Sequence, residues 1–447
     1  MISIKKIGLI YILIVSVIIL AGCHAPYILY ETGEADVTPG LPLRGFVREP
    51  QIRPPTAEEA VRFPQITNLP TLYIELEYIP FNRINREEYV PGSYTFIFGG
   101  ETGIFNEPLK IKGRGNWTWT NPKRSYTLVL AREASWNGLP SAGKWRMIAN
   151  WADKSLLRNY TALNLARILH DDWSPSSFFA DVFVNGEFQG NYLITEAIEI
   201  HENRLNLNRM TDGIFELEEP GRHPDHSECI RVADSNSCIV LRRPQGSVFP
   251  EVRAANLAVF SDFFREMQDS LNHGYESYSQ FIDVPSFVNW VILHEFAKDL
   301  DSGYFRASVW MFIQNGRLHM GPAWDFDTAF GNHPEGHATS PIGYKMTYSP
   351  WFRRLMRDDT FLRLVQERWT ELRQDGVFDD FLRNIYVKSI YIEESARRNF
   401  EVWPCALEFT FLRGRQLSRF TFADEVDYLY DWVKTRIEWL DAQWYIG

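Results

Sequence analysis

Residues 294–332, HEFAKDLDSGYFRASVWMFIQNGRLHMGPAWDFDTAFGN, carry four aspartates around one predicted hairpin. The segment that leads into them, 285–298, has apolar residues at helical spacing, and Asp283 precedes it as a candidate N-cap. Asp299 and Asp301 follow the predicted helix C-terminus, where the helix dipole already supplies partial negative charge. Two carboxylates at that position repel the dipole and each other, so we expect a cation among them.

The hairpin is predicted from two strand-like runs, Tyr304–Gln314 and Arg317–Ala323, that flank Asn315-Gly316. Asn-Gly is typical of a two-residue turn, and such a turn fixes the register of the two strands. Counting back from the turn places Arg306 opposite Asp325. The hairpin therefore returns its second strand to the neighbourhood of the first two aspartates.

The second pair of aspartates lies just beyond the hairpin. Alternate residues of an extended chain share a face, so Asp325 and Asp327 are expected to point the same way. Together with Asp301 they would form an oxygen-rich site of the kind that Mg²⁺ or Mn²⁺ prefers. The alternative is a solvated hairpin end with ordinary surface acids, and the residues alone leave both interpretations open.

The overall composition is that of a globular protein, with 45% hydrophobic and 23% charged residues. The formal net charge of −11 gives no indication of a nucleic-acid partner. An acidic chain that binds an anionic ligand needs a metal ion or a local basic cluster. The aromatic content of 15% predicts large packed interfaces or aromatic-lined pockets.

The N-terminus resembles a bacterial lipoprotein signal peptide. Lys5-Lys6 precede an apolar run from Ile7 to Leu20, which ends in the lipobox-like tetrapeptide Leu20-Ala21-Gly22-Cys23. The resemblance implies cleavage of residues 1–22, acylation of Cys23 with chains such as palmitate, and a membrane-anchored lipoprotein outside the cytoplasm. An uncleaved membrane anchor is the alternative, and it also places the body of the protein outside the cytoplasm.

The other three cysteines show no zinc-binding spacing. Cys229 and Cys238 lie nine residues apart in a polar stretch, so they could form a disulfide in an oxidising compartment. Cys405 would then stay unpaired.

Beyond the signal peptide, the segments of the chain differ in composition. Residues 23–65 are rich in proline and glycine, which predicts a flexible tether. Residues 66–220 are β-rich, with a second Asn-Gly hairpin at Asn185-Gly186. Residues 219–250 are polar and predict an insertion loop, and residues 250–447 are mostly helical.

Four blocks of the chain resemble the CotH family, typified by spore coat protein H: LKIKGRGNWTW (109–119), KWRMIANWADKSLLRN (144–159), NGEFQGNYLITE (185–196) and GPAWDFDTAFGN (321–332). The likeness runs in order over about residues 69–440. It implies an α+β, atypical protein-kinase-like fold, with a β-rich N-terminal half and a mostly helical C-terminal half. The CotH-like domain is accordingly expected at residues 66–447.

The resemblance also implies roles for the aspartates. Asp301 matches the acid that is expected to orient the substrate hydroxyl as catalytic base. Asp325, in W-D-F-D, matches the acid that binds Mg²⁺ or Mn²⁺ on the phosphates of ATP. Asp327 is a further metal candidate because of its same-face position. Asp299 stands where many relatives are expected to have asparagine, so the local ligand set here would differ from theirs.

An acidic protein that binds a triphosphate needs basic partners, and the front half offers several. The helix that Asp153 is expected to cap carries two of them. Each basic residue taken singly is as well explained by a structural or surface ion pair. The candidates for nucleotide binding are Arg114, Lys123, Lys154 and Arg158, together with Glu196, which could pair with a lysine.

The resulting function hypothesis is a metal-dependent kinase. It would transfer a phosphoryl group from ATP to serine or threonine hydroxyls of a protein substrate at the cell envelope or spore coat. The first alternative is a non-catalytic envelope or spore-coat scaffold that keeps the kinase-like fold. A weaker alternative is a glycan-binding or glycan-hydrolysing protein, because such enzymes also use paired carboxylates.

Overall fold

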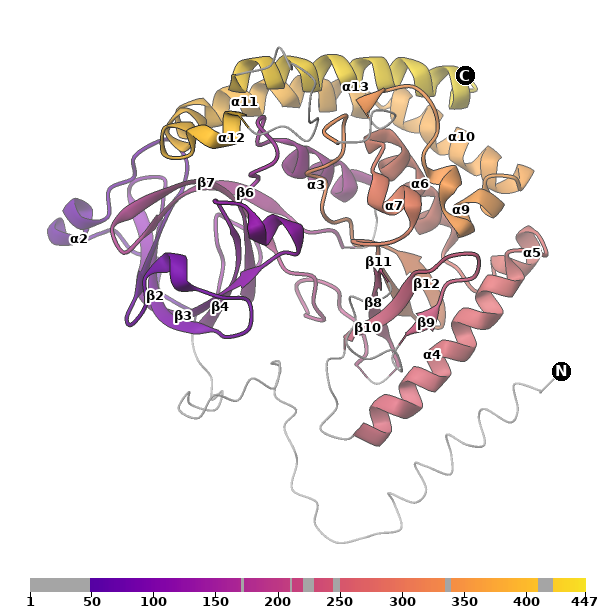
Figure 1. Cartoon of the computed structure of the whole chain (residues 1–447), viewed down its shortest axis with the longest axis horizontal. Helices are drawn as coiled ribbons and strands as arrows, with labels where there is room; N and C mark the ends of the chain where they lie inside the picture. Colours follow the sequence, from indigo (N-terminus) through magenta and orange to yellow (C-terminus); the bar gives the residue numbers. More distant parts are fainter. Residues whose placement is uncertain are drawn as a thin grey trace, which may run out of the picture. The chain divides into compact units, whose positions relative to one another are not determined.

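The computed structural model describes residues 49–169, 173–209, 211–219, 229–243, 250–333, 339–408 and 421–447, coloured along the chain in Figure 1. The predicted signal peptide (1–22), the lipidation residue Cys23 and the predicted tether as far as residue 48 lie outside these residues. None of the described helices is long and apolar enough to cross a membrane.

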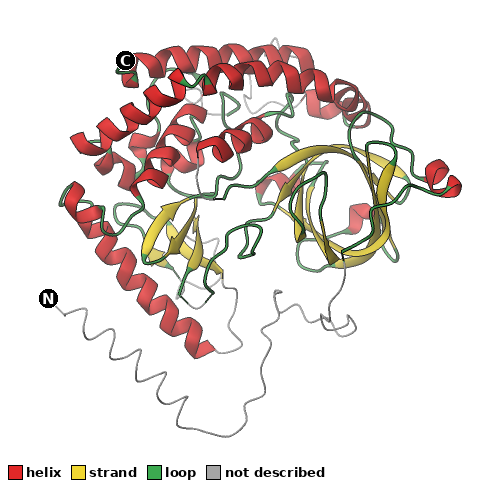
Figure 2. Ribbon diagram, turned by 180° about the vertical axis from the view of Figure 1, so that it is seen from behind, coloured by secondary structure: helices red, strands yellow, loops and turns green. Residues whose placement is uncertain are grey.

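Seven strands of the N-terminal part close into a barrel, visible as the ring of strands in Figure 2. Their order is β1-β2-β3-β4-β5-β7-β6, and the parallel pairing of β1 with β6 closes the ring. Period-two alternation fills the barrel with apolar side chains, and there Trp136 stacks on Phe96 and Trp145 with ring centroids 5.0 and 5.2 Å apart. The strands are β1 Thr71–Leu76, β2 Val90–Phe98, β3 Thr102–Arg114, β4 Ser125–Ala134, β5 Ala142–Ile148, β6 Ser177–Val184 and β7 Glu187–Glu196.

A second sheet has five strands in the order β12-β11-β8-β10-β9. Residues 219–250 were predicted as an insertion loop, and this is wrong for β9 and β10. The apolar run Ile239–Leu241 is buried where β10 pairs with β8, which explains why it forms a strand. The strands are β8 Gly213–Glu218, β9 Ile230–Arg231, β10 Cys238–Arg243, β11 Trp310–Gln314 and β12 Arg317–Met320.

Both predicted Asn-Gly hairpins are confirmed. The first joins β6 to β7 through Asn185-Gly186, and the second joins β11 to β12 through Asn315-Gly316. Each turn residue has the positive φ that this type of turn requires, between 50° and 79°. The disulfide between Cys229 and Cys238 is also present, and Cys405 is a free, exposed cysteine.

The C-terminal part is mostly helical, so the α+β architecture matches the prediction. Helix α6 is buried along almost its whole length, and α11 and α13 pack side by side (Figure 1). The helices are α2 Ala57–Arg62, α3 Arg158–Leu169, α4 Pro250–Ser270, α5 Tyr275–Tyr278, α6 Val284–Ala297, α7 Leu300–Tyr304, α9 Pro350–Leu355, α10 Asp359–Gln374, α11 Val377–Val402, α12 Pro404–Glu408 and α13 Phe422–Trp444, with 3₁₀ turns at Phe81–Arg83, Trp117–Thr120 and Met346–Tyr348.

Helix α11 joins the helical part to the barrel at β7. Gly190 has a φ of 97°, and a Cβ there would lie 2.5 Å from Asn399 Oδ1, so only glycine permits this close approach. The buried Lys123 ammonium donates to Asn399 Oδ1 at 2.8 Å, to the Ala149 carbonyl at 3.0 Å and to the Asn191 carbonyl. Lys123 therefore binds the barrel to α11.

The described end of the predicted tether is attached to the barrel. Arg53 pairs through its backbone with Gly103 of β3 and forms an ion pair of 2.6 Å with Glu59. Thr56 caps α2 with a reciprocal capping box, which explains why a helix forms in this stretch. Residues 53–62 of the predicted tether therefore form a strand pairing and a short helix, and the flexibility of the tether stays a prediction.

Candidate active site

Helix α6 leads the chain into the candidate site. Asp283 caps it as predicted, since its carboxylate accepts the Ser286 N–H at 2.9 Å. The helix ends at Ala297, and the left-handed φ of 49° at the next residue, Lys298, turns the chain. Asp299 then caps α7 by accepting the Asp301 N–H at 3.2 Å. Asp301 therefore lies in the first turn of α7.

A buried histidine connects this turn to the loop after the hairpin. His294 Nδ1 lies 2.9 Å from Asp299 Oδ2, and its ring stacks between Trp290 and Phe326, with centroids 3.8 and 5.1 Å away. Burial lowers the pKa of His294, so the ring is neutral and Nδ1–H donates to Asp299. Phe326 lies between the two candidate metal-binding acids in the sequence. His294 was not predicted from the sequence as a site residue, although it lies five residues before Asp299.

The residues after the hairpin do not continue its strands. Strand β11 begins only at Trp310 and β12 ends at Met320, so the predicted pairing of Arg306 with Asp325 is wrong. Asp325 has a left-handed φ of 68°, which ends the period-two alternation that the same-face prediction for Asp327 assumed. The Asn-Gly turn fixes the register only as far as the ladder of backbone hydrogen bonds extends.

The four aspartates nevertheless lie near enough for their charges to act on one another, through loops instead of through the ladder. Burial raises the pKa of Asp325 and raises that of Asp327 well above its usual value. Burial also raises the pKa of Asp301 to about 7, and the charges of Asp299 and Asp325 add to this shift. Carboxylates repel one another in this way only when they lie close together. The charges of the four aspartates therefore act on one another, while their convergence on one metal ion stays a prediction.

The acids differ in accessibility. Asp299 keeps 2% of its side-chain surface exposed, and its two oxygens are hydrogen-bonded to His294 and to the backbone N–H of Asp301. Asp301 keeps 32% exposed. A hydroxyl group from outside the protein can therefore reach Asp301 but not Asp299.

Two arginines partly balance the negative charge. The Arg114 guanidinium lies 5.2 Å above the Trp324 ring, and its charge opposes the rise that burial causes in the pKa of Asp325. Arg306 Nε lies 3.3 Å from Asp301 Oδ1. Arg114 was predicted from the sequence to belong to the site, whereas Arg306 was not.

A family model described as CotH kinase protein matches residues 111–440, which cover most of the chain and all four aspartates. The chain belongs to the CotH kinase protein family. The comparison with curated proteins gives no match. Among solved structures, a chain of the Shewanella oneidensis MR-1 toxin–antitoxin complex of HipA, HipB and operator DNA is 11% identical, with 89% of this chain and 74% of that chain covered and a TM-score of 0.22. At that TM-score the similarity supports no inference about this chain.

Arg158 has a structural place in this CotH protein. Its side chain is fully buried and forms ion pairs with Asp153 at 2.6 Å and with Glu425 at 2.8 Å. It also donates to the carbonyls of Ala329 at 3.2 Å and Phe330 at 3.4 Å, in the loop after the acids. All of its polar atoms are directed inward, so we replace the nucleotide-binding interpretation with a structural one. Asp153 also accepts the Arg158 N–H at 2.8 Å, and α3 accordingly begins at Arg158, later than a cap at Asp153 predicts.

Three further nucleotide candidates of this CotH chain are also held inside the protein. Lys123 occupies the joint between the barrel and α11 described above. Glu196 is buried, accepts the Ser176 N–H at 2.8 Å and lies 3.8 Å from Arg204, so its basic neighbour is an arginine and not a lysine. Lys154 is buried in the loop between β5 and α3. Of the five candidates, Arg114 is the one whose charge acts on the aspartates.

The donor chemistry of the site fits a divalent cation. In the described part of the chain, no three histidine, cysteine, aspartate or glutamate side chains stand close enough to bind a metal ion together. Asp325 and Asp327 are nevertheless neighbouring carboxylates whose burial disfavours their charge, and each of the other acids increases that cost for Asp327. A bound cation would relieve this repulsion, so these two residues are the ones that would hold Mg²⁺ or Mn²⁺.

Proposed function

We propose that this CotH protein is a divalent-metal-dependent protein kinase, which transfers the γ-phosphoryl group of ATP to serine or threonine hydroxyls. The observation that carries the proposal is Asp301, which keeps 32% of its side-chain surface exposed, together with the half-buried Asp325 and Asp327, whose charges act on it and on each other. Phosphoryl transfer needs one acid that addresses the acceptor hydroxyl and another that binds the metal on the phosphates. Membership of the CotH kinase family supports this division of roles.

In the proposed reaction Asp301 accepts the proton of the acceptor hydroxyl while that oxygen bonds to the γ-phosphorus. The bond between the γ-phosphorus and the β–γ bridging oxygen breaks, and ADP leaves with the electron pair. A pKa of about 7 for Asp301 suits a base that works near neutral pH. Ser308 Oγ donates to Asp325 Oδ2 at 3.0 Å and so orients that carboxylate. Mg²⁺ or Mn²⁺ held by Asp325 and Asp327 would neutralise charge on the phosphates.

We also propose that the protein works outside the cytoplasm, tethered to a membrane through lipidated Cys23. The lipobox-like sequence motivates this setting, and the Cys229–Cys238 disulfide supports it because such bonds persist in oxidising compartments. The acceptor would then be a protein of the envelope or of a spore coat.

A transfer assay tests the proposed function. The purified protein is incubated with γ-labelled ATP, Mn²⁺ and a pool of serine- and threonine-containing peptides. We expect label on the peptides, a loss of at least about a hundredfold in Asp301→Asn, and normal activity in Asp262→Asn, which changes an exposed acid on α4. Absence of transfer by the wild-type protein with every peptide would favour the non-catalytic scaffold.

A further inference from the structure

The loop between α7 and β11 contacts both Asp301, the candidate base, and Asp325, a candidate metal ligand. It runs over residues 305–309, and its ends, Phe305 and Val309, are completely buried. Phe305 and Ser308 both have left-handed φ angles, 56° and 54°, which are uncommon for residues with a side chain. A backbone of this kind persists only where the surroundings hold it in place.

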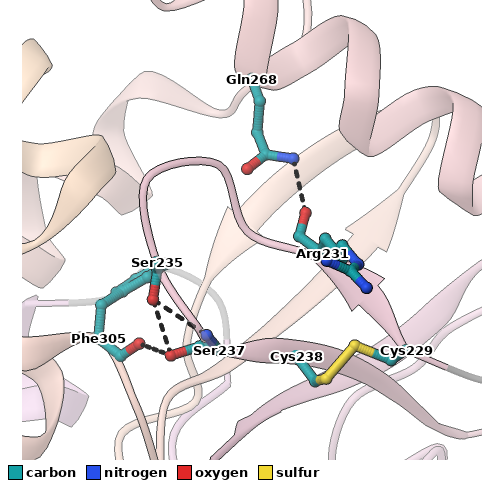
Figure 3. Close-up of a disulfide and its surroundings, with 7 residues drawn as sticks. All are labelled: Cys229, Arg231, Ser235, Ser237, Cys238, Gln268 and Phe305. Atoms are coloured by element: carbon teal, nitrogen blue, oxygen red, sulfur yellow. Dashed lines mark hydrogen bonds between the residues drawn. A yellow bond between two sulfur atoms is a disulfide. The ribbon is translucent and has the colours of Figure 1, made fainter. Parts of the chain in front are cut away.

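The surroundings of Phe305 supply that support. Its ring packs 4.8 Å from the Trp351 ring, and its carbonyl accepts the Ser237 hydroxyl at 2.6 Å (Figure 3). Ser237 directly precedes Cys238, whose disulfide to Cys229 lies beside it in the same view. The start of the loop is therefore fixed both by aromatic packing and by the disulfide-bonded hairpin.

Held in this way, the loop presents one side chain to each acid. Ser308 reaches Asp325, as described above. Arg306 donates its backbone N–H to the Asp301 carbonyl at 3.2 Å and directs Nε at Asp301 Oδ1, 3.3 Å away. A single rigid segment thus reaches both the candidate base and the candidate metal ligand.

The Arg306 guanidinium is only partly used by these contacts. Its side chain keeps 37% of its surface exposed, lies over the Tyr304 ring at 5.0 Å and approaches Glu219 no closer than 3.7 Å. Among the described residues, none accepts a hydrogen bond from its two terminal nitrogens. When its terminal nitrogens are not otherwise bonded, the planar guanidinium of an arginine can donate two parallel hydrogen bonds to the oxygens of a phosphoryl group. The ammonium group of a lysine cannot do this.

Arg158 shows what a structural arginine looks like in the same protein. It is fully buried, and its guanidinium is bonded to two carboxylates and to backbone carbonyls. Arg306 has the opposite character, since it is partly exposed, weakly paired and adjacent to the acid that would receive the substrate proton. If the ion pair of Arg306 with Asp301 served only to hold α7 in place, the guanidinium would not need to be exposed beside the candidate base.

We propose that Arg306 is a catalytic residue that binds the γ-phosphoryl oxygens of ATP beside Asp301. This proposal rests on the kinase function proposed above. In the transfer, the acceptor oxygen bonds to the γ-phosphorus, the bond to the β–γ bridging oxygen breaks, and the acceptor proton passes to Asp301. Arg306 neutralises charge on the γ-phosphoryl oxygens throughout this step, and it forms and breaks no covalent bond.

The test compares nucleotides that differ by the γ-phosphoryl group. Affinities for a non-hydrolysable ATP analogue and for ADP, both with Mg²⁺, are measured by calorimetry for the wild-type protein, Arg306→Ala, Arg306→Lys and Arg317→Ala. Arg317 is the matched control, because it is an exposed arginine at the hairpin turn, away from the acids. The melting temperature of each variant without nucleotide shows whether it folds.

We expect Arg306→Ala to bind the ATP analogue about ten- to a hundredfold more weakly, with ADP affinity changed less than twofold. Arg306→Lys should recover part of the loss, and Arg317→Ala should match the wild type. Equal loss of both nucleotides, or no loss of either, would overturn the role of Arg306 while leaving the kinase proposal standing. If the wild-type protein binds neither nucleotide, the kinase proposal fails and the role of Arg306 fails with it.

Discussion

His294 and Asp299 form a buried pair, 2.9 Å apart, at the point where α6 ends and α7 begins. The imidazole stacks on Phe326, and the carboxylate caps the helix that carries Asp301. The pair therefore connects the two segments that supply the candidate base and the candidate metal ligands. Its two members act on the site through Asp301 and Phe326 and do not themselves need to touch a substrate.

Replacing His294 by phenylalanine should keep the stacking between Trp290 and Phe326 but leave the Asp299 carboxylate without its donor. A buried oxygen, here Asp299 Oδ2, that loses its hydrogen-bond donor costs about 1–3 kcal/mol, so we expect a loss of this size in urea unfolding. His273→Phe is the control, since its side chain is 62% exposed at the end of α4. A His294→Phe protein as stable as the wild type would show that the pair does not hold this turn together.

Replacing Arg158 by methionine separates the structural interpretation from a nucleotide-binding one. The change leaves Asp153 and Glu425 buried without their cation, which is expected to cost about 3–5 kcal/mol in urea unfolding. The contrasting variant is Arg114→Met, which should unfold close to the wild-type midpoint. An Arg158→Met protein of normal stability that fails to bind ATP would return Arg158 to the list of nucleotide ligands.

The disulfide should contribute to both stability and activity. Closing the short loop between Cys229 and Cys238 is expected to stabilise the fold by about 2–3 kcal/mol, on the model in which the bond restricts the unfolded chain. The double change to serine should lower stability by that amount. It should also slow transfer, because Ser237 next to it holds Phe305.

Cys405→Ser is the matched control for the disulfide variant, since that cysteine is free and exposed. It should be indistinguishable from the wild type in urea unfolding and in transfer. If the double variant lost stability but kept its full transfer rate, the hairpin would have no role in positioning the loop over residues 305–309.

The raised pKa of Asp301 predicts a dependence of stability on pH in the metal-free protein. Its pKa rises from the ordinary value of 3.8 to about 7. Between these values the native carboxyl keeps a proton that the unfolded chain has released, so this group makes stability fall as pH rises from about 4 to 7. Asp301→Asn removes that contribution. The melting temperature of the variant should therefore exceed that of the wild type by an amount that grows across this range, and a constant difference would contradict the shift.

Local signals predicted a large part of the fold. The Asn-Gly turns, the Asp283 cap and the alternating strands each depend on neighbouring residues, so they could be identified without the structure. Strand β10 could not be identified in the same way, because it is a strand through its pairing with β8, more than twenty residues earlier in the chain.

The sequence indicated which acidic residues belong to the candidate site, but it did not indicate how they are arranged. The sequence placed the four aspartates in one neighbourhood, but the extension of the hairpin register through Asp325 ignored the left-handed backbone at that residue. Basic residues were assigned to the nucleotide from their number and position, yet Lys123 and Arg158 satisfy buried groups that belong to distant segments. Arg306 was missed because its approach to Asp301 depends on the turn at Phe305.

Metal-dependent binding of ATP is measured by a thermal-shift titration with ATP, with and without Mn²⁺, for the wild-type protein and for Asp325→Asn. We expect a rise in the wild-type melting temperature of several degrees that requires both ATP and Mn²⁺, and little or no rise in the variant. An equal rise in the two proteins would remove Asp325 from the metal site. A wild-type protein that showed no metal-dependent shift with ATP would contradict the kinase assignment itself.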